Sequence, residues 1–322
     1  MTGPDDLPTF DDVVTTAARI AGVVHHTPVL TCRTLDDLCQ AHVFFKCENL
    51  QKVGAFKARG ASNAVLSLSN EKAARGVATH SSGNHGAALA WAAARRGIPA
   101  HVVMPRTSKA VKKAAVASYG AHVIECEPTL AAREATLAEV VAVTGATFVH
   151  PYNDPRVIAG QGTAALELCE EVHGLDAILA PVGGGGLLSG TALAVSGHCP
   201  HTAVWGVEPR AADDAFRSLQ VGHIVPSLDP RTVADGLRTS LGTRTFALIQ
   251  RHVRGIVTVS EEAIVAAMRL VWERMKIVVE PSSAVPLAAL LEGGLELAGQ
   301  RVGIILSGGN VDLEELAWGG RT

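Results

Sequence analysis

The sequence predicts an α/β fold in which helices cover both faces of parallel sheets. Short apolar segments typical of buried strands alternate with longer helical segments along most of the chain. Such a βαβα order is typical of parallel sheets, because the helix between two strands returns the chain to the same edge of the sheet. Three strands are followed by glycine-rich or small polar residues. Ligands bind beyond the carboxyl ends of strands in open α/β sheets, so we expect the functional site there.

The individual elements follow from short apolar runs and from the helical periods between them. In the first half we expect strand 76–79, a helix ending at Arg96, strand 100–104, helix 108–119, strand 121–125, helix 129–144 and strand 146–150. In the second half we expect strand 177–180 followed by a glycine run and a helix, strand 203–207, helix 261–275 and strand 302–306.

Composition narrows the class of protein. The chain has 322 residues, enough for one large domain or two modest ones, and 28 Lys and Arg against 31 Asp and Glu give a net charge of −3. This balance argues against a nucleic-acid or anionic-membrane partner. The first residues lack the pattern of a signal peptide, and the apolar stretch 87–94 is too short to span a bilayer. The six cysteines include no CxxC pair and suggest neither zinc nor a disulfide framework, so we expect a cytoplasmic protein.

Lys57 is the first candidate for chemistry. It follows Gly54, Ala55 and Phe56 at the predicted start of a helix. The positive end of a helix disfavours a charged lysine, and an unprotonated amine is what Schiff-base chemistry needs. Phe56 could pack beside an aromatic cofactor. The alternative is an ordinary surface lysine, and other motifs are needed to reject it.

The second candidate is the run of glycines at 183–186, between a predicted strand and a predicted helix. Glycine lets backbone N–H groups converge on an anion, and the helix N-terminus adds a favourable potential. We interpret the run as a phosphate-binding loop. It matches neither the Walker pattern nor the dinucleotide fingerprint, and the alternative is a tight turn.

Two further segments lie at predicted strand ends. In 81–86, SSGNHG, small polar groups before a helix could bind a carboxylate, and Asn84 could meet a phenolic oxygen. The alternative there is helix capping by Ser82 or Asn84. In 307–310, SGGN, the Ser307 hydroxyl could meet a ring nitrogen, and the alternative is a simple turn.

Together these segments resemble a known family. The segments are KCENLQKVGAFKARG, SSGNHG, HPYNDPRVIAGQGT, VGGGGLLSG, VEPRAADD, ADGLRTSLG and SGGN. The chain resembles the fold-type II pyridoxal-phosphate enzymes of the serine/threonine dehydratase and serine racemase group, from about residue 27 to residue 312. The resemblance implies two open, twisted, mainly parallel sheets flanked by helices. It also implies a large cofactor-binding domain of residues 1–67 and 152–322, a small domain of residues 68–151, and a homodimer.

The resemblance also implies roles for single residues. Lys57 would hold the cofactor as a Schiff base and later remove the substrate α-proton. The cofactor contacts that it implies are Phe56, Asn84, Gly183, Gly184, Gly185, Gly186, Leu187, Gly236 and Ser307. The contacts to the substrate α-carboxylate that it implies are Ser81, Ser82, Asn84 and His85.

A divalent-cation site is implied in the segment VEPRAADD. Its ligands would be Glu208, the carbonyl of Ala212, and Asp214. Two carboxylates, a carbonyl and waters suit Mg²⁺ or Ca²⁺. The alternative is a solvated acidic patch.

The reaction implied is dehydration and deamination of a small β-hydroxy amino acid. The segments ATHSSGNH, ECEP and VEPSSAVP look most like the branch that acts on 3-hydroxyaspartate. Its second carboxylate would need a partner, for which Arg133, Thr239 and Arg238 are candidates, although each arginine could instead form a surface ion pair. Serine and threonine remain alternative substrates.

Two other functions stay open. The first is an amino-acid racemase, because in racemase members the second serine of SSGNHG, here Ser82, supplies an acid/base group opposite the lysine. The second is a non-catalytic protein that binds pyridoxal phosphate. Lys57 argues against the latter, since scaffolding needs no imine.

Overall fold

Two β-sheets organise the chain, and the computed structural model describes residues 6–313, apart from the side chain of Val111. Within these residues the larger sheet has the spatial order β1 (Val29–Thr31), β2 (His42–Cys47), β10 (Arg301–Leu306), β7 (Ala177–Pro181), β8 (Ala203–Pro209), β9 (Gly255–Val259). The smaller sheet has the order β5 (His122–Cys126), β4 (Ala100–Pro105), β3 (Val77–His80), β6 (Thr147–Phe148). All neighbouring strands are parallel except β1 and β2, so the predicted α/β class is confirmed.

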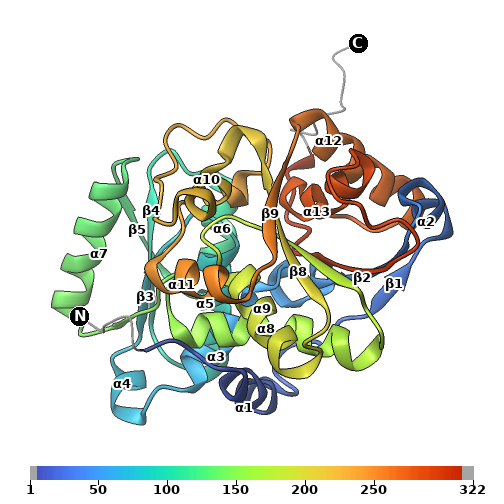
Figure 1. Ribbon diagram of the computed structural model, residues 1–322. Coiled ribbons are helices and arrows are strands. Elements are labelled where there is room, and N and C mark those ends of the chain that lie inside the picture. Colours follow the sequence, from blue (N-terminus) through green and yellow to red (C-terminus); the bar gives the residue numbers. More distant parts are fainter. Residues whose placement is uncertain (1–5, 314–322) are drawn as a thin grey trace.

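Helices cover both faces of the smaller sheet. Leu137 of α7 (Leu130–Thr144) packs against Ala78 and Val103 on one face. On the other face, α5 (Asn84–Arg96) and α6 (Ala110–Ser118) pack against Val102 and Met104. Figure 1 shows this sheet on the left of the molecule, with α7 outside it.

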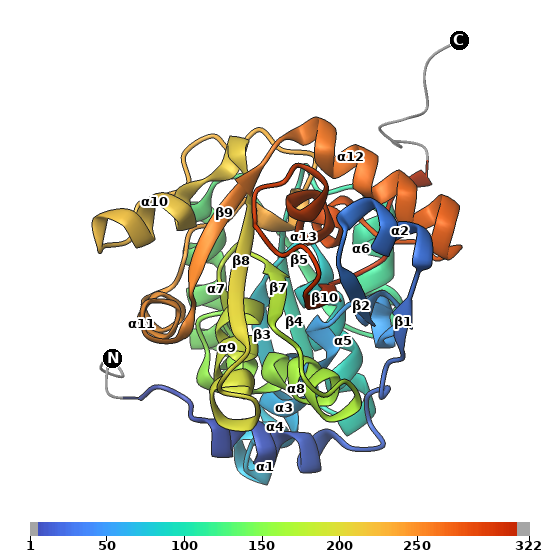
Figure 2. The same cartoon turned by 45° about the vertical axis from the view of Figure 1, so that its right-hand side comes forward.

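The larger sheet is also covered on both faces, because alternate strand residues point to opposite sides. Ile304 packs with α2 (Arg33–Cys39), α12 (Glu261–Leu270) and α13 (Pro281–Leu291). Its neighbour Ile305 packs with the opposite layer. The helices of that layer are α1 (Phe10–Ile20), α8 (Pro155–Glu171), α9 (Gly186–His198), α10 (Asp214–Val221) and α11 (Thr243–His252). In Figure 2, α1, α8 and α9 group at the bottom, and α12 and α13 lie at the top.

The helix α3 (Lys57–Leu66) connects the two layers, because it packs against both α5 and α8 and, together with α4 (Asn70–Ala74), against β3. Glycines allow its close approach. A Cβ added to Gly160 would lie 2.4 Å from the Cα of Gly60, and one added to Gly162 would lie 2.7 Å from the carbonyl oxygen of Gly190. The backbone of α8 therefore contacts the backbone of α3 on one side and that of α9 on the other. These contacts fix the start of α3 relative to the start of α9.

Most predicted elements are confirmed, with boundary shifts of a few residues. The predicted helix 261–275 differs, because α12 ends at Leu270 and a π-helical turn follows from Val271 to Met275. The sequence analysis did not identify β1, β2 or β9. The domain boundaries at residues 67 and 152 stay a prediction, although the strands of the smaller sheet all lie between them. In the described part of the chain, every helix is too short or too polar to cross a membrane.

Candidate active site

Lys57 begins α3 directly beside the end of β10. The amide N of Phe56 donates to the carbonyl of Ser307 at 3.0 Å, and Ala55 forms a β-bridge with Gly308. Two predicted motifs that are 250 residues apart in the sequence, GAFK and SGGN, are therefore hydrogen-bonded neighbours. This places the lysine at the carboxyl edge of the larger sheet.

The Lys57 amine occupies a poorly solvated position. Its Nζ donates to the carbonyl of Pro151 at 2.7 Å and lies 5.0 Å from the centre of the Phe56 ring. Burial lowers the pKa of Lys57 to about 8, and the nearby Glu280 carboxylate opposes this shift. An amine with this pKa is partly unprotonated near neutral pH, as nucleophilic and general-base chemistry require.

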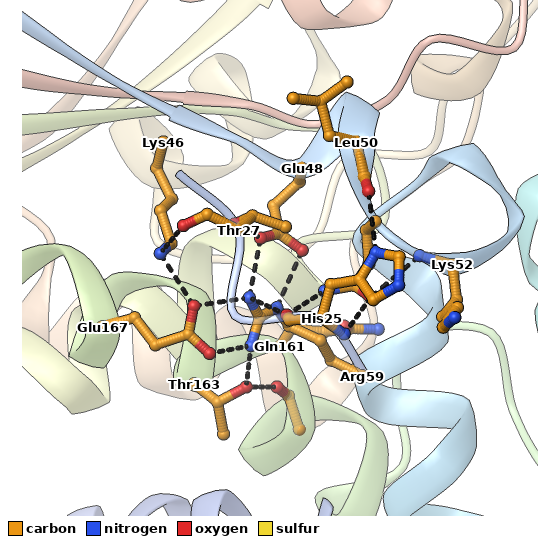
Figure 3. Close-up of polar contacts among 12 residues, drawn as sticks. His25, Thr27, Lys46, Glu48, Leu50, Lys52, Arg59, Gln161, Thr163 and Glu167 are labelled. Carbon is orange, nitrogen blue, oxygen red and sulfur yellow. Dashed lines mark hydrogen bonds and ion pairs between the residues drawn. The ribbon is translucent and has the colours of Figure 1, made fainter. Parts of the chain in front are cut away.

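Figure 3 shows a buried ion-pair network that anchors α3 two residues after Lys57. The Arg59 guanidinium donates to Glu48 at 2.7 and 2.8 Å and to Glu167 at 2.6 and 2.7 Å. Lys46 lies 2.7 Å from the same Glu167 carboxylate. The side chains of Arg59, Glu48 and Lys46 have no exposed surface. Because these residues come from β2, α3 and α8 and from the turn after β2, the network joins the three elements around the lysine.

The glycine loop connects β7 to α9 and has no room for side chains. A Cβ on Gly184 would lie 2.3 Å from the Tyr152 ring, and one on Gly183 would lie 3.0 Å from the Cα of Leu237. Gly185 has a φ of +84°, a conformation that glycine adopts without strain. The loop leads directly into α9, whose first residues include the buried Leu187. A loop of this shape at a helix N-terminus fits a phosphate group.

The segment around Gly236 lies against this loop. A Cβ on Gly183 would approach the carbonyl oxygen of Gly236 at 3.2 Å and the Thr239 hydroxyl at 3.3 Å. Thr239 is exposed. The structure thus brings together the predicted residues Gly183, Gly236 and Thr239. Arg238, in contrast, donates from Nε to the carbonyl of Thr232 at 3.1 Å and from Nη2 to the same oxygen, so its guanidinium is tied to its own loop.

The SSGNHG segment joins β3 to α5. Helix capping by a serine or by Asn84 does not occur, because Gly83 is the N-cap residue and no side chain caps the helix. The hydroxyl of Ser81 accepts from the amide of Gly83 at 3.4 Å, and Ser82 is partly exposed. His85 is buried, with Nε2 3.3 Å from the carbonyl of Val149. Burial holds the pKa of His85 well below its usual range, so the ring is neutral and any contact of His85 with a carboxylate would use its backbone N–H.

Asn84 belongs to a polar cluster that includes a residue not identified from the sequence, Glu280. The Asn84 Nδ2 lies 3.1 Å from both carboxylate oxygens of Glu280, and its Oδ1 accepts from Asn310 at 2.9 Å. Burial raises the pKa of Glu280 to about 7, although the hydrogen bond from Asn84 lowers it. The available signal in the sequence was an acidic residue directly before Pro281, in the segment VEPSSAVP.

Ser307 directly follows β10 and is buried, with 2% of the residue exposed. Its oxygen is 3.3 Å from the hydroxyl of Ser283, which in turn donates to the carbonyl of Gly308 at 2.7 Å. The Ser307 hydroxyl is therefore held by two neighbouring elements, β10 and α13. Its neutral oxygen can accept from, or donate to, a ring nitrogen without adding charge.

Arg133 is on α7, on the small-sheet side of the site. Its side chain is partly exposed, and its Nε donates to the carbonyl of Thr129 at 3.4 Å, a long bond within its own helical turn. Burial and then the positive charge of Arg133 lower the pKa of His80, whereas burial raises the pKa of Tyr152 and Arg133 only opposes that rise. The charge of Arg133 is therefore felt at His80, which ends β3 directly before the SSGNHG segment.

His150 joins this group and was also missed by the sequence analysis. Its ring centre lies 4.6 Å from that of Tyr152. Its Nδ1 accepts from the amides of Tyr152 and Asn153 at 3.3 and 3.0 Å. Burial lowers the pKa of His150 to about 4. The neutral ring therefore carries its proton on Nε2, where it can donate a hydrogen bond.

Glu208 and Asp214 form a separate acidic pair at the end of β8. Both side chains are fully buried. The Glu208 oxygens accept from the amides of Ala215 and Phe216 at 3.1 and 2.9 Å. Neither Asp214 oxygen has a hydrogen-bond partner of ordinary geometry among the described residues, although the Ser227 hydroxyl lowers its pKa.

The pKa values of this pair reflect uncompensated burial. Burial, and then the charge of Asp214, raise the pKa of Glu208 to about 9, and burial raises that of Asp214 to about 6. Two adjacent buried carboxylates with free lone pairs fit a hard cation. The buried Ala212 lies in the turn between them. No third acidic, histidine or cysteine side chain completes the set within the described residues, so a carbonyl and waters would have to supply the other ligands.

Comparisons with known proteins agree with this geometry. The sequence model of the family "Pyridoxal-phosphate dependent enzyme" matches residues 20–308. A beta-hydroxyaspartate dehydratase of Paracoccus denitrificans is 53% identical over 312 residues, which cover 97% of this chain and 99% of the relative. An L-threo-3-hydroxyaspartate ammonia-lyase of Saccharomyces cerevisiae is 48% identical, with 97% and 96% covered. The crystal structure of serine racemase from Dictyostelium discoideum superimposes with a TM-score of 0.92 at 48% identity, covering 95% of this chain and 99% of that one.

Proposed function

Because the chain belongs to the pyridoxal-phosphate dependent enzymes, we propose that it is an ammonia-lyase that acts on 3-hydroxyaspartate. The reaction removes water and then ammonia and leaves a 2-oxo acid. The observation that carries the proposal is the position of Lys57, a lysine of lowered pKa at the sheet edge where the polar residues of SSGNHG and SGGN also gather. The two hydroxyaspartate-cleaving relatives favour this substrate over serine and threonine.

The residues present suit the cofactor. The backbone amides of Gly183, Gly184, Gly185, Gly186 and Leu187 would bind its phosphate at the start of α9. Tyr152 packs so closely on Gly184 that a side chain at this position would collide with its ring, so the loop presents only backbone atoms. Asn84 would donate a hydrogen bond to the phenolic oxygen of the cofactor. Ser307 would hydrogen-bond its pyridine nitrogen. Phe56 and Gly236 would pack against the ring.

Pyridoxal phosphate, when bound, supplies an electron-withdrawing ring that makes the α-proton of an amino acid acidic. Lys57 would take that proton, because its amine is partly unprotonated near neutral pH. Ser81, Ser82, Asn84 and the amide of His85 would hold the α-carboxylate at the start of α5. The β-hydroxyl leaves with a proton as water. The released 2-imino acid then hydrolyses to the 2-oxo acid and ammonia.

Arg133 would recognise the second carboxylate of the substrate, and Thr239 is a further candidate partner for it. Arg133 suits this role because its Nε makes one long bond within α7, so a stronger partner is available to the guanidinium at small cost. Thr239 is exposed beside Gly183. Serine lacks the second carboxylate and would gain nothing from Arg133.

A divalent cation, Mg²⁺ or Ca²⁺, would bind Glu208, Asp214 and the carbonyl of Ala212. Support comes from the orphaned oxygens of Asp214 and from the raised pKa of Glu208. Without a cation, ionising both buried carboxylates is unfavourable because their charges repel each other, so a bound cation would stabilise the turn between β8 and α10. The competing view is that Glu208 caps the N-terminus of α10, a role that leaves Asp214 unexplained.

Amino-acid racemisation is the second candidate activity. Ser82 supports it, because this serine caps no helix and is partly exposed at the start of α5. The serine racemase of similar fold also supports it. Ser82 would exchange a proton with Cα on the face opposite Lys57. Elimination from one enantiomer needs Lys57 alone.

We also propose that the enzyme is a homodimer in the cytoplasm and that its domains divide at residues 67 and 152.

The assignment of the substrate is tested by supplying purified enzyme with 3-hydroxyaspartate, serine and threonine in each stereochemical form and measuring 2-oxo acid and ammonia. Preferred turnover of one hydroxyaspartate isomer supports the assignment. Faster turnover of serine or threonine at equal concentration refutes it.

A further inference from the structure

Two cysteines that the site does not use lie against each other in the core. Cys169 is near the end of α8, and Cys199 directly follows α9. Their sulfur atoms are 2.8 Å apart. A disulfide bond is about 2.05 Å long, so the two atoms need to approach by roughly 0.8 Å to form one.

The backbone already holds both residues in place. The amide of Cys199 donates to the carbonyl of Val195 at 2.9 Å, and the carbonyl of Cys199 accepts from Thr202 at 2.9 Å. The side chains of Cys169 and Cys199 pack in the same apolar core as α1, α8 and α9. Because α8 and α9 touch at Gly162 and Gly190, the two helices cannot slide without disturbing that core.

The two thiols differ in reactivity. Cys169 is 3% exposed, whereas Cys199 is partly exposed. Hydrogen bonding from the Cys169 thiol lowers the pKa of Cys199, and the same contact together with burial raises that of Cys169. The thiolate is the reactive form of cysteine, so Cys199 is the sulfur that reacts first.

We propose that Cys169 and Cys199 form a reversible disulfide that clamps α8 to α9. The oxidant is a small disulfide such as oxidised glutathione. The Cys199 thiolate attacks one of its sulfurs and releases one small thiolate. Cys169 then loses its proton, attacks the Cys199 sulfur of the mixed disulfide and releases the second small thiol. The protein loses two hydrogen atoms, and the small disulfide becomes two thiols.

The clamp lies far from the proposed active site. The glycine loop ends at the first residue of α9, and Cys199 follows the last, so the 13 residues of the helix separate them by about 20 Å. Turnover should therefore be the same in the oxidised and reduced enzyme. The bond closes a loop between residues 30 positions apart, which restricts the unfolded chain and should raise Tm by roughly 5–10 °C. This inference does not depend on the proposed substrate.

The test oxidises the purified holoenzyme with excess oxidised glutathione and blocks the remaining thiols with an alkylating reagent. Trypsin leaves both cysteines in one peptide, because there is no Lys or Arg between Arg156 and Arg210. Cleavage after glutamate separates them, since Glu170 and Glu171 lie between the two cysteines. The expected product is the peptide 168–170 joined to the peptide 172–208, which dithiothreitol separates.

Thermal unfolding of the same samples measures the clamp. Oxidation should raise Tm in the parent enzyme and in a Cys32→Ser control, and the rise should vanish in Cys169→Ser and in Cys199→Ser. Each variant is compared with its own reduced form, so a loss of stability from the substitution itself cancels. A persistent glutathione adduct on Cys199, a bond to another cysteine, or a cross-link that leaves Tm unchanged would overturn the proposal.

Discussion

Removal of the proposed divalent cation should make the stability of this enzyme depend on pH through Glu208. In the cation-free fold burial and the charge of Asp214 raise the pKa of Glu208 to about 9, against an ordinary value of 4.5. Between these values the folded state holds one more proton than the unfolded state, so stability falls as pH rises. At about 1.4 kcal/mol per pH unit, the free energy of unfolding should drop by about 2–3 kcal/mol between pH 6 and pH 8.

With Mg²⁺ or Ca²⁺ bound, Glu208 is ionised in the folded state as well, and this loss should disappear. The assay is urea unfolding at pH 6 and pH 8, in excess chelator and in excess cation, because the two pH values lie inside the window between 4.5 and 9. A Glu208→Gln variant is the control. It should lose most of the pH slope in chelator, with only the small contribution of Asp214 left near pH 6, and it should show no stabilisation by the cation.

Two results would refute this reasoning. A flat stability profile in chelator would mean that Glu208 is already compensated without a cation. A slope that is equal in chelator and in cation, with no metal in the purified protein by elemental analysis, would mean that the acidic pair binds none.

Four substitutions test the remaining assignments. Lys57→Ala should abolish turnover and the visible absorbance of the lysine-bound cofactor, whereas borohydride labelling of Lys46 or Lys52 in the parent enzyme would contradict the assignment. Arg133→Ala should raise KM for 3-hydroxyaspartate by about 10- to 150-fold, because it removes a charge-assisted hydrogen bond worth roughly 1.5–3 kcal/mol. KM for serine should stay nearly unchanged, and equal effects on both substrates would exclude this role of Arg133. Ser82→Ala should stop chiral interconversion and solvent deuterium exchange into the opposite enantiomer while 2-oxo acid formation continues, and undiminished racemisation would clear Ser82. Arg59→Met should cost about 3–5 kcal/mol in urea unfolding because it leaves the fully buried Glu48 carboxylate without its cation, whereas Glu167 keeps Lys46. The added Glu48→Gln change should recover part of that cost.

Sequence analysis succeeded best where one contiguous segment carries the signal. The glycine run is recognisable because four adjacent residues without side chains, after an apolar strand, leave few other conformations for a strand-to-helix turn. The strands β3, β4 and β5 were predicted because each is a short apolar run followed by a helical period. β2, with the sequence HVFFKC, was missed since its buried Lys46 looks like a surface residue until Glu167 of α8 is seen beside it.

The sequence by itself determined the α/β class and the family, because strand periodicity and the lysine and glycine motifs are local properties of the chain. It also singled out Lys57, although not the reason for its lowered pKa. Only the tertiary structure decided which distant residues meet. Glu280 faces Asn84 across 196 positions, Asn310 faces Asn84 across 226, and Cys169 meets Cys199 across 30. These contacts depend on the order of strands in the sheets and on the close approach of α3, α8 and α9. Both features join residues that are far apart in the chain, so no single segment of sequence predicts them.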